Sequence, residues 1–114
     1  MPYQEATQIV PSAARTTNGN SGMVNPGEAG ETLCLLVNVT AASGVGPSLA
    51  LSVEWSNDGT VWATPETADT FAAIIAAATK VKTFERKSVF YRVAWAITGT
   101  TPSFTFTIDE FFTN

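Results

Sequence analysis

Residues 48–56 read SLALSVEWS, and a large apolar side chain occupies every second position. These large side chains are Leu49, Leu51, Val53 and Trp55. Successive side chains of a β-strand point to opposite faces, so a period of two predicts a strand with one buried face. The segment is therefore predicted to be a strand with its polar face turned outward.

Two later segments repeat this alternation. Residues 90–98 and residues 103–109 each place large apolar side chains on one face. The members of that face are Tyr91, Val93, Trp95 and Ile97 in the first segment and Phe104, Phe106 and Ile108 in the second. Residues 99–102 read GTTP, which is turn-forming, so the two strands are predicted to form a hairpin.

Residues 32–40 are apolar on both faces, which predicts a strand that lies centrally or beneath another segment. Cys34, within this run, is expected to be a small core residue. Residues 69–84 are ambiguous because their alanines suit a helix while both ends resemble strands. Helix propensity is a weak determinant that packing overrides, and we favour strand, turn, strand over a helix.

Two turn signals predict further hairpins. Residues 57–60 read NDGT and connect residues 48–56 to a short strand at 61–64. Asn18-Gly19 gives a weaker signal, because the flanking residues are mostly small or polar.

These segments together predict an all-β fold, an antiparallel β-sandwich or jelly roll with about seven to nine short strands and no long helix. A single domain is expected, with residues 1–31 as a polar N-terminal arm that contains the weak hairpin and residues 32–114 as the sandwich core. The arm either packs over its own sandwich or is held by a neighbouring chain.

Composition narrows the classes of function. The 114 residues contain no His and one Cys, which removes the commonest general base and metal ligand and leaves no pair for a disulfide. We therefore expect no enzyme, and no catalytic, cofactor or metal site. The net charge of -4 argues against nucleic-acid binding. No long apolar run or signal peptide is evident, so no membrane association is expected.

The turn at residues 56–62, SNDGTVW, is similar to the turns of sugar-binding sandwich modules and, with one residue missing after Asp58, to sialidase-type Asp boxes. The favoured interpretation is structural, with Asp58 accepting hydrogen bonds from nearby amides. Trp55 and Trp95 lie on apolar strand faces, which leaves Trp62 as the candidate platform for a sugar.

Basic residues gather in one short stretch near the middle of the second half. A docking patch for an acidic partner would contain Lys80, Lys82, Arg86 and Lys87, with Arg92 nearby. The favoured alternative is that an edge strand carries lysines to discourage unwanted strand pairing.

Phe111 and Phe112 are adjacent, so in a strand their rings point to opposite faces and cannot enter the same core. Phe111 falls on the polar side, with Thr105, Thr107 and Asp109, and must fold under a loop or meet another subunit. Apolar side chains in the polar arm raise the same question. The candidate partner interface therefore contains Tyr3, Ile9, Phe111 and Phe112.

Residues 48–108, about half of the chain, carry a recurring pattern of packing residues and turns. The pieces are VEWS at 53–56, DG at 58–59 followed by Trp62, DTF at 69–71, YRVAW at 91–95 and GTTPSFTF at 99–106. This pattern resembles small β-sandwich virion proteins of tailed bacteriophages, and within that group capsid decoration (cement) proteins.

The resemblance implies a structural protein, made in the host cytoplasm, that binds the exterior of the assembled capsid and stabilises it. Its partners would be the major capsid protein or other virion proteins, with many copies or a homo-oligomer on a symmetric shell. No functional residue transfers from the family. The alternatives are a structural subunit of the tail or the head–tail connector, and a carbohydrate-binding module of a tail or fibre.

Overall fold

The computed structural model describes residues 6–113, and its regular secondary structure there is entirely β. This part of the chain contains no helix long and apolar enough to cross a membrane. Its strands are β1 (Thr7–Arg15), β2 (Gly19–Asn20), β3 (Thr32–Ser56), β4 (Asp69–Thr70), β5 (Ala78–Glu85) and β6 (Phe90–Thr113).

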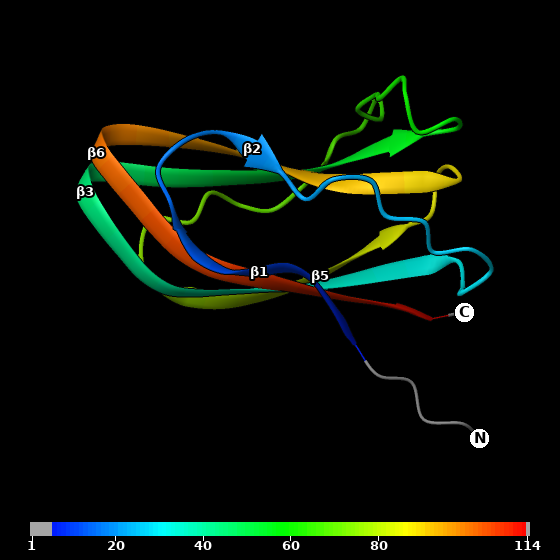
Figure 1. Ribbon diagram of the computed structural model, residues 1–114, viewed down its shortest axis with the longest axis horizontal. Coiled ribbons are helices and arrows are strands. Elements are labelled where there is room, and N and C mark those ends of the chain that lie inside the picture. The colour runs from blue at the N-terminus through cyan, green and yellow to red at the C-terminus, as the bar shows by residue number, and fades with distance from the viewer. Residues whose placement is uncertain (1–5, 114) are drawn as a thin grey trace.

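The long strands β3 and β6 pair antiparallel from end to end. Thr32 lies opposite Thr113 at one end of this ladder. Ser56 lies opposite Phe90 at the other end, and the register shifts around Val45 in the middle. Figure 1 shows both ribbons turning back together there, so that the paired strands fold over on themselves. The paired strands β3 and β6 thus supply the two central strands of both layers.

Glycine makes this bend possible. Gly44 and Gly99 have φ values of 110° and 126°, a region that side chains disfavour. A Cβ at Gly44 would lie 2.7 Å from the carbonyl oxygen of Thr101, and one at Gly99 would lie 2.9 Å from that of Gly46. At Gly44 and Gly99 the two strands therefore approach so closely that a side chain at either position would force the backbone to move.

The bend divides the sheet into two layers that face each other (Figure 1). The first layer has the order β1, residues 103–113 of β6, residues 32–43 of β3, and β5. The second layer has the order β2, residues 90–98 of β6, residues 48–56 of β3, and β4. Each layer is antiparallel, so the predicted antiparallel all-β sandwich is confirmed.

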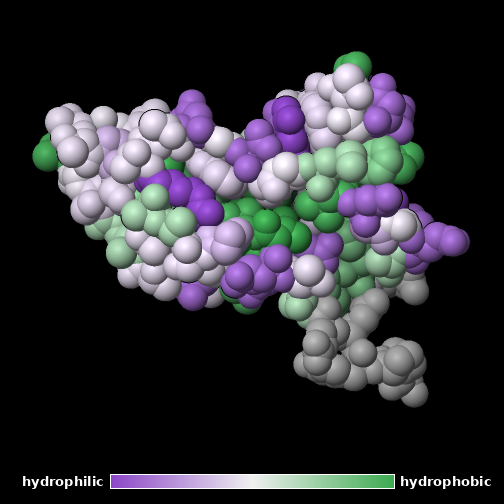
Figure 2. All heavy atoms as spheres, in the orientation of Figure 1, coloured by the Kyte–Doolittle hydropathy of each residue, from purple (hydrophilic) through white to green (hydrophobic). Residues whose placement is uncertain are grey.

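The core lies between the layers and contains the side chains that the alternation placed on one face. Figure 2 shows hydrophobic atoms in the seam between the layers. The members of the core that are fully shielded include Leu33, Leu35, Leu49, Val53, Tyr91, Phe104, Phe106 and Ile108. Residues 32–40 are central as predicted, since β3 pairs with β5 on one side and β6 on the other.

The predicted hairpin between residues 90–98 and 103–109 is wrong. These segments are two halves of β6 that lie in different layers, and each pairs with β3. Residues 99–102 form part of the shared bend instead of a tight reversal within one layer. For the same reason residues 6–113 form six strands, two of them long, where about seven to nine short strands were expected.

The weak hairpin at Asn18-Gly19 is also wrong. β1 pairs with β6 in the first layer, and β2 pairs with β6 in the second. The connection between them crosses from layer to layer, and the Asn18 side chain accepts a hydrogen bond of 2.8 Å from the amide of Ile97. The described part of the arm, residues 6–31, therefore packs on its own sandwich.

The ambiguous segment at residues 69–84 forms strand, turn and strand, as favoured. β4 pairs with the second layer, Ile74 bridges to Leu49, and β5 then joins the first layer. The NDGT turn also forms, and the amide and carbonyl groups of Trp55 and Ala63 exchange hydrogen bonds of 2.9 and 3.0 Å. The strand predicted at residues 61–64 is wrong, because this pair is an isolated bridge. Cys34 corrects our expectation: it lies on the outer face of β3 and is only partly buried, opposite the buried neighbours Leu33 and Leu35.

Candidate functional site

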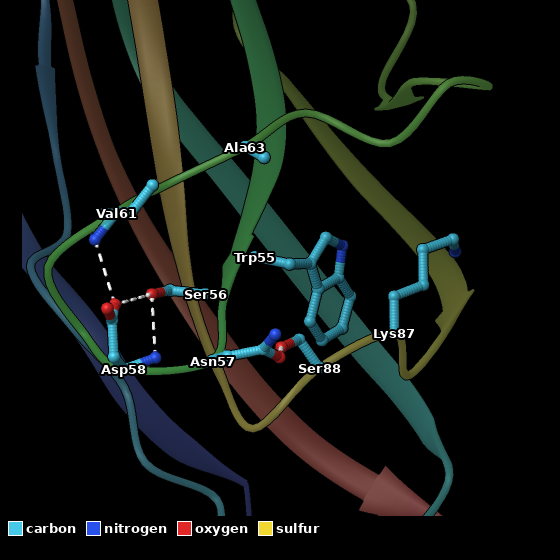
Figure 3. A pocket seen from close by; sticks show the side chains of 8 residues that line it. All are labelled: Trp55, Ser56, Asn57, Asp58, Val61, Ala63, Lys87 and Ser88. Atoms are coloured by element: carbon cyan, nitrogen blue, oxygen red, sulfur yellow. Dashed lines mark hydrogen bonds between the residues drawn. The ribbon is translucent and has the colours of Figure 1, made fainter.

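The Asp58 turn is held by its own side chains (Figure 3). Asp58 Oδ1 accepts hydrogen bonds from the amides of Thr60 and Val61 at 2.9 and 3.0 Å. It also accepts one from the Ser56 hydroxyl at 3.1 Å, while Ser56 Oγ accepts one from the Gly59 amide at 2.8 Å. These bonds, chiefly those from Val61 and Thr60, lower the pKa of Asp58 below its ordinary value. The predicted hydrogen bonds from nearby amides to Asp58 are confirmed.

Next to this turn, a buried carboxylate joins three parts of the chain. Asp69 Oδ2 accepts a hydrogen bond of 2.9 Å from the indole Nε1 of Trp55. Lys87 Nζ lies 3.0 Å from the same oxygen and 3.1 Å from Oδ1. The Lys87 ammonium is also 5.8 Å from the centroid of the Trp55 ring. Asp69 is thus paired with both a buried donor and a cation, which makes its burial tolerable.

A cleft of about 370 Å³ lies between this turn and the loop after β5 (Figure 3). It is lined by Trp55, Ser56, Asn57, Asp58, Val61, Ala63, Lys87 and Ser88. Ser88 donates a hydrogen bond to Asn57, and Lys87 is paired with Asp69. Most polar side chains of the cleft are therefore engaged with one another and serve to fix the loops.

Most basic side chains of the candidate docking patch bind other groups within the protein. Lys82 Nζ donates to the carbonyl oxygen of Thr70 at 2.5 Å, and Lys87 pairs with Asp69. Arg86 bonds several backbone carbonyls, those of Gly27 at 2.7 Å, Ser88 at 3.0 Å and Val89 at 3.0 Å. Lys80 and Lys82 lie on β5, which pairs with β3 on one side and forms an edge on the other. Lysines on such an edge discourage pairing with other strands, which is the interpretation we favoured.

Trp62 is the half-buried member of the three tryptophans. The Arg92 guanidinium lies 4.6 Å from the centroid of its ring, and Arg92 Nε donates to Glu54 Oε1 at 2.6 Å. Trp55 and Trp95 are 5% and 8% exposed and belong to the core. Trp62 therefore remains the candidate sugar platform, on the outer face of the second layer.

The most unusual surface lies on the outer face of the first layer. Phe111 pairs with Cys34 across β6 and β3, and Leu36 pairs with Val81 across β3 and β5. Leu36 and Val81 are 37% and 64% exposed. We call Cys34, Leu36, Val81 and Phe111 the outer apolar patch. Burial raises the pKa of the Cys34 thiol, which keeps it neutral within this patch.

A hollow of about 220 Å³ opens into the patch. Besides the patch residues, it is lined by Ala6, Asp109 and Glu110. The Tyr91 hydroxyl donates to Glu110 Oε1 at 3.2 Å. Burial raises the pKa of both groups, and the neighbouring Glu110 carboxylate raises that of Tyr91 further.

The candidate interface residues have different environments. Phe111 lies on the polar side of β6 as expected. Phe112 is 2% exposed and packs in the core against Tyr91, with ring centroids 6.0 Å apart, so it presents no surface to a partner. Ile9 is half-buried and packs against the core. Tyr3 lies outside the described residues.

Sequence reasoning missed Leu36 and Val81 as surface residues. The alternation does place Leu36 outward, because it falls between the inward Leu35 and Val37. It gave no such signal for Val81, because the lysines on either side of it would be expected to face solvent and in the structure they lie on the inner side. What was missing was the pairing of β5 with β3, which brings the two side chains together.

Among residues 6–113, no group of three or more His, Cys, Asp or Glu side chains is arranged to hold a metal ion. No known protein-family model and no curated protein sequence matches this chain.

Proposed function

We propose that this chain is a structural protein of a tailed-bacteriophage virion that binds the exterior of the assembled capsid and stabilises it. Its partner is the major capsid protein, and the symmetric shell presents the binding surface many times. Where copies bridge neighbouring capsid subunits, modest individual contacts add up to strong attachment through avidity.

The first support is the role of the residues that carry the phage-like pattern. Tyr91, Val93 and Trp95 are buried in the core, and Phe104 and Phe106 pack there from the other layer. A protein that bridges shell subunits needs a rigid body, and these packing residues provide one.

The observation that carries the proposal is the outer apolar patch. Leu36, Val81 and Phe111 lie together on the face of a sheet instead of between the layers. Adjoining apolar side chains on an exposed sheet face, bordered by polar residues, are typical of a surface that another protein covers.

The test is binding to shells that lack this protein, assembled from the major capsid protein of the same genome. We expect saturable cosedimentation of the protein with intact shells and a higher shell melting temperature when it is bound. Phe111→Ser should abolish the binding. Val45→Ser is the matched control, because Val45 is 74% exposed at the bend, away from the patch. Absence of saturable binding by the unmodified protein would refute the proposal.

The stacking of Trp62 on Arg92 favours one alternative, a carbohydrate-binding module of a tail or fibre. The charged pair of Arg92 and Glu54 beside an aromatic ring offers both stacking and hydrogen bonds to a sugar. Quenching of tryptophan fluorescence by host-surface glycans, lost in Trp62→Ala, would support this alternative. Rings formed by the purified protein without capsid would instead indicate a connector or tail subunit.

A further inference from the structure

The outer face of the first layer has an unusual charge distribution. Residues paired across an antiparallel sheet share a face, so the ladder registers identify which side chains belong to it. Apart from the patch, the strand residues on this face include Gln8, Thr32, Asn38, Thr79, Thr83, Glu85, Thr105, Thr107, Asp109 and Thr113. The charged members are Glu85 and Asp109, both acidic. Within residues 6–113, neither carboxylate forms an ion pair.

The basic residues of the chain number six, and none belongs to this face. Lys80 and Lys82 share rungs with the core residues Val37 and Leu35, on the inner side of the layer. Arg15 also lies inward, with its guanidinium 4.7 Å from the Phe106 ring centroid. The remaining three are the internally bonded Arg86, Lys87 and Arg92. The face thus combines an apolar centre with two carboxylates that form no ion pair within residues 6–113.

This arrangement disfavours a second copy of the chain as the occupant. Two copies packed face to face would bring carboxylates of like sign together and supply no basic side chain to neutralise them. Pairing through strand edges is disfavoured as well. β1 contains Pro11 and two register shifts, and β5 carries the inward-pointing lysines.

We infer that the outer face of the first layer binds a different protein, whose surface presents apolar side chains bordered by lysine or arginine. This inference rests on the proposed function and names the chemistry that the capsid surface must offer. An apolar side chain of the partner enters the hollow between Phe111, Leu36 and Val81. Basic side chains around it face Asp109 on one side of the patch and Glu85 on the other.

The experiment measures binding of charge variants to the same unoccupied shells over a range of salt concentrations. Asp109→Lys and Glu85→Lys should each weaken binding by about tenfold or more at low salt, because each places like charges together. Glu66→Lys is the matched control, since it makes the same charge change on an exposed loop residue before β4. Binding of the unmodified protein should weaken as salt rises, and the double variant Asp109→Asn, Glu85→Gln should lose much of this dependence.

Thermal melting of each variant identifies any loss of folding, and the neutral double variant tests the charge without introducing repulsion. If the unmodified protein binds shells but these variants bind equally well, the inferred partner chemistry is wrong while the capsid-binding function stands. If the unmodified protein does not bind shells, both proposals fail. A dimer in sedimentation analysis that Phe111→Ser dissociates would show that a second copy occupies the face and would overturn the inference.

Discussion

The indole Nε1 of Trp55 donates a hydrogen bond of 2.9 Å to Oδ2 of Asp69, joining the end of β3 to the start of β4. Both side chains are buried, and Lys87 supplies the opposite charge. The segments VEWS at 53–56 and DTF at 69–71, which are separated by residues 57–68 in the sequence, therefore meet in a single contact.

Asp69→Ala should lower the free energy of unfolding by about 2–3 kcal/mol, because it leaves the buried indole N–H without an acceptor. Lys87→Met should cost less, about 1–2 kcal/mol, because the buried Asp69 carboxylate loses its cation but keeps the Trp55 hydrogen bond, and the Lys87 side chain is itself 35% exposed. Urea denaturation followed by tryptophan fluorescence measures both. Equal losses in the two variants would contradict the dominant role of the Trp55 hydrogen bond.

Phe112→Ala should destabilise the fold by about 3–4 kcal/mol, because the ring is 2% exposed and its removal leaves a cavity against Tyr91. Phe111→Ala should cost about 1 kcal/mol or less, since its ring lies on the outer face and leaves no closed cavity. Chemical denaturation of the two variants compares neighbouring residues of the same type. A larger loss for Phe111 would mean that its ring belongs to the core.

Glu110→Gln should make the protein more stable relative to the unmodified chain at neutral pH. Burial raises the folded-state pKa of Glu110 above its ordinary value of 4.5, so the folded protein favours the protonated carboxyl. The stability gained from the protonated Glu110 carboxyl is therefore complete below pH 4.5, and it is lost as the pH rises through the raised folded-state pKa. Denaturation curves across this range should therefore show the two proteins diverging with increasing pH, and parallel curves would contradict the raised pKa.

Asp58→Ala should destabilise the NDGT turn at pH values above 3.8, where the Asp58 carboxylate is charged in both the folded and the unfolded protein. The folded-state pKa of Asp58 lies below its ordinary value of 3.8, because the carboxylate accepts amide hydrogen bonds. Its stabilising contribution is present above 3.8 and disappears as the pH falls through the lowered pKa. The difference in stability between the variant and the unmodified protein should thus shrink on acidification. Asp58→Asn, which keeps one acceptor oxygen, should lie between them.

Of the outer apolar patch, Phe111 alone could be predicted from local spacing. The adjacency of Phe111 and Phe112 showed that one ring must lie outside the core, and the alternation with Thr105 and Thr107 identified which one. The sequence could not show that Leu36 and Val81 lie beside each other, because they belong to strands far apart in the chain. It also could not show that Arg86 and Lys87 are occupied by carbonyl groups and a carboxylate of distant loops.

Local alternation by itself determined that this chain is all-β and which side chains of residues 48–56, 90–98 and 103–109 face the core, because the period of two follows from the geometry of a single strand. Only the tertiary structure decided which strands pair. The GTTP segment has the same turn chemistry in a hairpin and in a bend, and the choice depends on Gly44 lying against Thr101 in the partner strand. The tertiary structure likewise decided that the outer face carries negative charge. All six basic side chains lie elsewhere in the folded molecule, where they bond acceptors, contact aromatic rings or share a rung with core residues.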